Sequence, residues 1–98
     1  MSVGHYRLSP AAHRDLSSIW DYTVERWDAR QAEIYVLEIR SAIERIAEQP
    51  ERGRAIDDIR TGYRRYAIGT HLIFFTESDD GVDVIRILHQ RMDPTRHL

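Results

Sequence analysis

The sequence predicts an α+β domain in which two helices pack on a mostly antiparallel sheet. Two stretches with apolar residues three and four positions apart come first, and three strand-like segments separated by glycine-containing turns follow them. With a short strand at the start, the expected order is β-α-α-β-β-β. No linker, repeat or low-complexity tract divides the 98 residues, so we expect residues 1–98 to form a single domain.

The first strand and the first helix are expected close to the N-terminus. His5 to Leu8 is the candidate strand, and Ser9-Pro10 is typical of a helix start, because the serine side chain can cap free backbone amides. The apolar stripe of this helix consists of Ala12, Leu16, Ile19, Trp20, Thr23 and Trp27. We expect at least one tryptophan to pack between the helices and the sheet, so that Trp20→Ala would cost about 3–5 kcal/mol.

A second helix follows after a very short link. Asp28 and Gln31 resemble a capping box, and Gln49-Pro50 ends the helix. Its apolar face consists of Ala32, Tyr35, Ile39, Ala42, Ile43 and Ile46. Because the link is so short, the two helices should form an antiparallel hairpin.

Beyond the second helix the pattern changes to that of strands. Residues 51–62 are polar and rich in turn formers, so we expect a loop there. Strands are expected at Tyr63 to Ile68, His71 to Thr76 and Val82 to His89. The turns between them are Gly69-Thr70 and Asp79-Asp80-Gly81.

The last two strands look apolar on both faces. Successive side chains of a strand point to opposite faces of the sheet. In the middle strand this places Leu72 and Phe74 on one face and Ile73 and Phe75 on the other. In the last strand it places Val84 and Leu88 opposite Ile85 and Ile87. The helices can cover one face, whereas the nine residues after His89 are polar and few. We therefore expect an apolar face that is either open or covered by a partner.

Composition excludes several classes of function. A net charge of -2 does not suit a general nucleic-acid coat protein, and we expect no direct sequence-specific nucleic-acid binding. Without cysteine there is neither a disulfide nor a thiolate metal site, and all 14 basic residues are arginine, which excludes Schiff-base chemistry. The five histidines lack metal-ligand spacing, so no metal and no cofactor is expected. No segment has membrane-spanning length or the apolar core of a signal peptide, so we expect a cytoplasmic protein.

One set of basic residues lies on or beside the strands: Arg60, Arg64, Arg65, Arg86, His89 and Arg91. These side chains could form an anion site in which arginines hold a phosphate or carboxylate and His89 transfers a proton. Alternatively, each arginine lies along its neighbours with its charge in water. Arg86 is flanked by apolar strand residues, so we expect it to be paired.

A family resemblance runs through the whole chain in order and spacing. Its residues are Tyr6-Arg7-Leu8-Ser9-Pro10-Ala11-Ala12, Asp15-Leu16, Ile19-Trp20, Gly53-Arg54, Ile59-Arg60, Tyr63-Arg64, Arg86-Ile87-Leu88-His89 and Met92-Asp93. With these residues the chain resembles the ParE toxins of bacterial toxin–antitoxin systems. The resemblance implies a RelE/ParE fold, a cognate ParD-type antitoxin as partner and DNA gyrase as target.

The resemblance leaves two mechanisms open. ParE-like members poison gyrase by binding, and the residues expected to contact the target are Arg60, Arg64, Arg65, His89 and Arg91. RelE-like members are ribosome-dependent messenger-RNA endonucleases, with a basic residue at the start of the middle strand and a Tyr or His-Tyr at the end of the last. Here His71 and His89-Gln90 hold those places, and a nuclease would use Arg64 or Arg65 together with His89. A third possibility is an interaction module without toxicity.

The antitoxin is expected to be a disordered tail that folds on binding. Residues 52–65 carry five arginines against Asp57 and Asp58, a charge balance that suits an acidic tail. The residues expected to contact the antitoxin are Arg52, Arg54, Phe75, Ile85 and Arg86.

Overall fold

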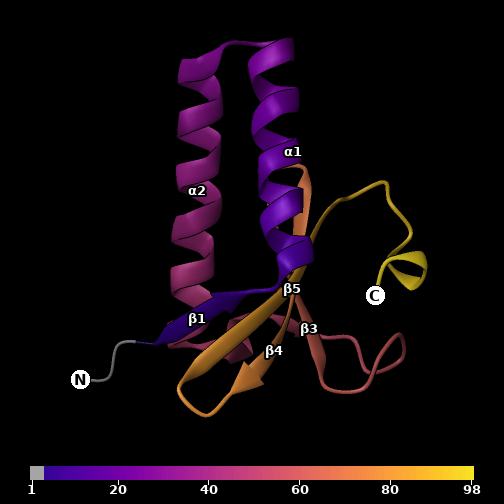
Figure 1. Ribbon diagram of the computed structural model, residues 1–98. Helices are drawn as coiled ribbons and strands as arrows, with labels where there is room; N and C mark the ends of the chain where they lie inside the picture. Colours follow the sequence, from indigo (N-terminus) through magenta and orange to yellow (C-terminus); the bar gives the residue numbers. More distant parts are fainter. Residues whose placement is uncertain (1–3) are drawn as a thin grey trace.

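The computed structural model describes residues 4–98, in which a hairpin of two helices stands over a five-stranded sheet (Figure 1). The helices and strands are β1 (His5–Leu8), α1 (Pro10–Arg26), α2 (Ala29–Glu48), β2 (Arg54–Ala55), β3 (Tyr63–Ile68), β4 (His71–Ser78) and β5 (Gly81–His89), with 3-10 turns η1 (Pro50–Arg52) and η2 (Pro94–Arg96). The predicted α+β order is confirmed, with β2 as an additional strand. Among the described residues, neither helix is both long and apolar enough to span a membrane.

Both helices begin at the caps that the sequence predicts. The Ser9 side chain accepts a hydrogen bond from the Ala12 amide at 2.9 Å, and the Asp28 carboxylate accepts one from the Gln31 amide at 2.7 Å. These contacts satisfy amides that have no partner inside the helix. The link between the helices lies at the end of the hairpin far from the sheet (Figure 1).

The sheet is mixed, with strand order β1-β5-β4-β3-β2. Strands β3, β4 and β5 form an antiparallel meander, β2 pairs antiparallel with β3, and β1 lies parallel to β5. The turn between β3 and β4 contains Gly69 at φ 55°, a left-handed conformation that glycine adopts without strain. Strand β2 was missed because it is only two residues long within a polar segment.

A β-bulge changes which side chains of β5 face the helices. Phe74 pairs with Arg86 and Phe75 pairs with Val84, which leaves Ile85 as the extra residue. The bulge reverses the alternation, because Val84 and Ile87 both lie in the core under the helices whereas Leu88 faces the other way. The sequence-based assignment of Val84 and Leu88 to one face, opposite Ile85 and Ile87, is therefore wrong.

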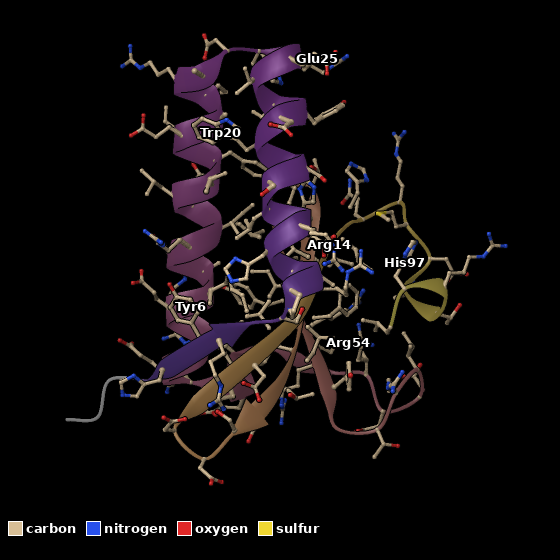
Figure 2. The ribbon with its side chains drawn as sticks, in the orientation of Figure 1. Tyr6, Arg14, Trp20, Glu25, Arg54 and His97 are labelled. Atoms are coloured by element: carbon tan, nitrogen blue, oxygen red, sulfur yellow. The ribbon has the colours of Figure 1, made fainter. Side chains whose placement is uncertain are left out.

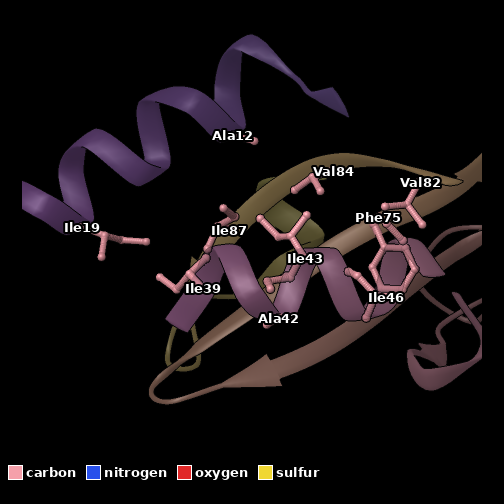
Figure 3. Close-up of a cluster of buried hydrophobic side chains, with 12 residues drawn as sticks. Ala12, Ile19, Ile39, Ala42, Ile43, Ile46, Phe75, Val82, Val84 and Ile87 are labelled. Carbon is pink, nitrogen blue, oxygen red and sulfur yellow. The ribbon is translucent and has the colours of Figure 1, made fainter. Parts of the chain in front are cut away.

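The main core lies between the helical hairpin and the sheet (Figure 3). Helix α2 contributes five of the twelve buried side chains of this core, and β4 and β5 supply five more from the opposing surface. The buried members are Ala12, Ile19, Ile39, Ala42, Ile43, Ile46, Ala47, Ile73, Phe75, Val82, Val84 and Ile87. This core fixes the position of the hairpin relative to the strands.

The opposite face of the sheet is covered by the chain itself. Phe74 and Leu88 are each 1% exposed there, packed against Ile56 from the segment before β3 and against Leu98. The segment returns to the sheet because the Ile56 amide donates to the Tyr63 carbonyl at 2.9 Å. The expectation of an open or partner-covered apolar face is therefore corrected: a nominally polar loop and the C-terminal residues close it.

The tryptophans do not fill the space between the helices and the sheet. Trp20 is 37% exposed and Trp27 is 70% exposed. Ile19 occupies the position that faces the core, so Trp20, about 100° further around the helix, lies on the hairpin above the strands (Figure 2). Trp27 follows the last residue of α1, at the far end of the hairpin. The expectation that at least one tryptophan packs between the helices and the sheet is therefore wrong.

Candidate functional site

Several arginines gather where β2 pairs with β3. Arg54 and Arg65 are directly opposite each other in the strand register. The Arg60 guanidinium lies 5.4 Å from the centre of the Tyr63 ring. Within residues 4–98, Arg54, Arg60 and Arg65 form no ion pair. Because like charges directly opposite each other on a sheet repel, this pair favours an anionic partner.

Two further arginines of this region are held by neighbouring groups. The Arg64 guanidinium donates to the Gly53 carbonyl at 2.8 Å and to the Glu77 carboxylate at 3.2 Å. Arg52 is exposed on η1 and donates to the Gln49 side chain at 2.8 Å. The predicted arginines of residues 52–65 therefore share one end of the sheet, and Arg64 is the most restrained of them.

Arg86 is paired inside the chain, as the sequence predicts. Its Nε and Nη2 atoms each donate to the Asp15 carboxylate at 2.8 Å. Asp15 also accepts the Ile87 amide at 2.9 Å. Strand β1 ends at Leu8, which pairs with Val84, so β5 has no neighbouring strand on this side beyond that point. There the Asp15 carboxylate, and not a strand, accepts the hydrogen bond of the Ile87 amide. The carboxylate raises the pKa of Arg86 further above its ordinary value.

The two apolar residues expected to meet an antitoxin differ in accessibility. Phe75 is fully buried in the core under the helices, so it cannot contact a partner in this conformation. Its position follows from the β4 register, which turns Phe75 toward α2 and Phe74 toward the opposite face. Ile85 is the extra residue of the bulge and is half-buried.

His89 lies at the other end of the sheet, beside a cavity that the sequence did not reveal. His89 is opposite His71 in the register, and the two ring centres are 5.3 Å apart. The hydroxyl of Tyr35, from α2, contacts Nδ1 of His71 at 2.6 Å. Arg91 is exposed next to this group, and its backbone amide donates to Nδ1 of His89 at 3.1 Å.

Burial, together with the neighbouring His89, lowers the pKa of His71 from its ordinary value of 6.5 to about 4. His71 is therefore neutral at neutral pH. Of the charged and titratable groups around it, Asp15 acts in the opposite direction and favours the protonated ring.

This shift predicts a pH-dependent stability. The unfolded chain protonates His71 near pH 6.5 and the folded chain only near pH 4, so stability is present above pH 6.5 and is lost as the pH falls toward 4. We expect a loss of about 1–2 kcal/mol from this group, since the partly exposed ring is screened by solvent. Urea denaturation at pH 7 and pH 4 should show a smaller difference for His71→Gln than for the wild type. His13→Gln, at an exposed position, should keep the wild-type difference.

Arg64 and Arg65 do not converge with His89. His89 is in register with His71 and, through it, with Ile68 on β3. Arg65 lies three residues further along β3, which places its Cα about 14 Å from that of His89, and its side chain faces the opposite surface of the sheet. Arg64 shares the surface of His89 but lies one residue further away along β3. An arginine and a histidine acting on one scissile phosphate would have to lie closer together.

Comparisons with known proteins agree with this architecture. The family described as the ParE toxin of the type II toxin–antitoxin system parDE matches residues 6–94. Toxin ParE1 of Mycobacterium tuberculosis is 50% identical over 94 residues, covering 95% of this chain and 96% of the relative. Toxin ParE1 of Caulobacter vibrioides is 44% identical over 93 residues, covering 95% of this chain and 96% of that protein.

A solved structure adds a likeness in fold. A chain of the chromosomal ParDE TA system from P. aeruginosa has a TM-score of 0.76 at 17% identity, covering 89% of this chain and 96% of that chain. At this identity the likeness concerns the fold alone. The sequence relatives and the family match carry the assignment: this chain belongs to the ParE toxin family of type II toxin–antitoxin systems.

Proposed function

We propose that this chain inhibits DNA gyrase in the cytoplasm by binding to it, and that a ParD-type antitoxin neutralises it. The observation that supports binding over catalysis is the distance along the sheet between His89 and the two arginines that a nuclease would use, Arg64 and Arg65, of which Arg65 also lies on the opposite surface. The proposed target-binding residues are Arg60, Arg64, Arg65, His89 and Arg91.

A supercoiling assay tests the target. The purified wild type should inhibit supercoiling of relaxed plasmid by gyrase, and the double variant Arg60→Ala/Arg65→Ala should need roughly tenfold more protein for the same inhibition, since two charged contacts are lost. Arg14→Ala/Arg30→Ala, which removes two exposed arginines of the helices, is the matched control and should behave as the wild type.

Messenger-RNA cleavage is the outcome that would reverse this proposal. The wild type should leave ribosome-bound messenger RNA intact in a purified translation reaction. Cleavage by the wild type that His89→Ala abolishes would instead establish the nuclease activity.

The antitoxin surface has a charged part and an apolar part. Arg52 and Arg54 offer exposed charge near the β2 edge, whereas Arg86 is largely neutralised by Asp15. The helical hairpin exposes large apolar side chains, which suit an amphipathic helix of the partner: Trp20, Tyr22, Trp27, Ile34 and Leu37. The acidic groups of the antitoxin would meet the arginines, and its apolar side chains would meet the hairpin.

Binding kinetics with the cognate antitoxin separate these two contributions. Leu37→Asp should weaken the complex roughly a hundredfold, mainly through faster dissociation, because it places a charge in the apolar contact. Arg54→Ala should mainly slow association and reduce the dependence of the rate on salt. Unchanged affinity in Leu37→Asp would exclude the hairpin from the interface.

A further inference from the structure

A cavity of about 670 Å³ opens between α1, α2 and the adjacent ends of β4 and β5. Its volume lies in the range of small-molecule sites. Aromatic side chains from the hairpin, Tyr22, Trp27 and Tyr35, line it together with Ile19 and Ile87. His71 and His89 also line it, so a mainly apolar space contains two imidazoles.

Both imidazoles can present an N–H group to this cavity. Nδ1 of His89 accepts the Arg91 amide, so the hydrogen of the neutral ring is on Nε2. The Tyr35 hydroxyl has two possible acceptors, Nδ1 of His71 at 2.6 Å and the Ile68 carbonyl at 3.3 Å. Because the contact with His71 is the shorter one, and the Thr70 hydroxyl lies 3.3 Å from the same nitrogen, we assign the His71 hydrogen to Nε2 as well. Neither Nε2 atom has a partner, and no buried unpartnered side-chain nitrogen or oxygen occurs among the described residues. Both N–H groups therefore reach solvent.

Asp15 is the carboxylate in the cavity lining, and it is already occupied. Its two oxygens accept hydrogen bonds from Arg86 or the Ile87 amide, and Arg86 balances its charge. The exposed Arg26 at the rim adds a positive charge with no ion-pair partner among residues 4–98. The Ser18, Tyr22 and Gln31 side chains can donate as well as accept, so the charge of Arg26 and the two ring N–H groups favour an anionic ligand.

We propose that this cavity binds a small organic carboxylate with an aromatic or aliphatic body. The carboxylate accepts hydrogen bonds from Nε2 of His71 and of His89, and the apolar body lies against the aromatic side chains of the hairpin. The match of donors to an anionic oxygen, and of the apolar walls to the rest of the ligand, selects this class over a cation or a neutral hydrocarbon. The site shares His89 with the residues proposed to bind gyrase and lies beside Arg91, but Arg60, Arg64 and Arg65 do not line it.

A titration with two isosteric probes tests the charge requirement in the wild type alone. We expect 3-phenylpropionate to bind with a Kd of roughly 1–10 mM, the range for a ligand of this size, and 3-phenylpropionamide to bind at least about tenfold more weakly. The measurement is the change in NMR signals of the histidine rings and of the Trp27 indole. Shifts should be confined to the cavity residues.

Two substitutions then test the donors. His89→Asn and His71→Asn, whose shorter side chains remove the donor at the Nε2 position, should each weaken the carboxylate about tenfold while changing the amide little, and His13→Gln, outside the cavity, should bind as the wild type does. Circular dichroism verifies that each variant is folded. Tyr35→Phe keeps the aromatic wall and removes one hydroxyl donor to His71, so it should lower carboxylate affinity more than amide affinity.

Three results would overturn the proposal. These are equal affinity for carboxylate and amide, shifts centred on residues outside the cavity, and no binding of the carboxylate up to about 50 mM, well above the expected range.

Discussion

Replacing Phe74 by alanine is expected to lower the free energy of unfolding by about 3–5 kcal/mol. The ring is 1% exposed and packs with Ile56, Leu88 and Leu98 on the sheet face opposite the helices. Removing it leaves a cavity that the surrounding side chains fill only in part, which adds to the lost burial of the ring. Urea denaturation followed by circular dichroism measures the change.

Trp27→Ala is the matched control for Phe74→Ala. It also removes a large aromatic side chain, but one that is 70% exposed at the end of the hairpin. We expect it to change stability by less than about 1 kcal/mol. If both substitutions had the same small effect, the contacts of Phe74 with Ile56, Leu88 and Leu98 would not stabilise the fold, and this face of the sheet would in effect be open.

The order of elements could be predicted because its signals are local. Ser9-Pro10 and Asp28 with Gln31 mark helix starts through contacts within one turn, and the structure contains both caps. The strands were recognisable for the same reason, since alternation and turn residues are read over a few positions. The clustering of arginines in residues 52–65 also follows from the sequence, because all of them lie within one short stretch of the chain.

The faces of the sheet could not be predicted, because they depend on contacts between distant segments. The bulge at Ile85 breaks the period of two that the sequence analysis assumed. Ile56 lies in a mostly polar segment and gives no periodic signal, although it packs against Phe74 and Leu88 on the face of the sheet opposite the helices. The cavity is similarly invisible in the sequence, since Tyr35, His71 and His89 come from three separate elements.

The tryptophans show that an apolar stripe predicted from the sequence can be wider than the face that the helix buries. Positions three and four residues apart define an apolar face, but only its centre is buried when the helix crosses a narrow sheet. Ile19 takes the centre, and Trp20 lies beside it. The exposed tryptophan rings are accessible to a binding partner, and for this reason they are part of the proposed antitoxin surface.

Replacing Asp15 by alanine is expected to lower the free energy of unfolding by about 2–4 kcal/mol. The substitution removes three hydrogen bonds, two from Arg86 at 2.8 Å and one from the Ile87 amide at 2.9 Å. It leaves a guanidinium whose side chain is only 22% exposed without its counter-charge, and an amide of β5 without an acceptor.

Asp83→Ala is the control for this substitution, because Asp83 also pairs with an arginine, Arg7, at 2.9 Å. That pair is exposed, so its loss should have little effect on stability. The double variant Asp15→Ala/Arg86→Ala should be less destabilised than the sum of the single variants, because removing both partners leaves no unpaired buried charge. Strict additivity would mean that the two side chains do not stabilise each other, and the role assigned to Asp15 at the edge of β5 would then reduce to its bond with the Ile87 amide.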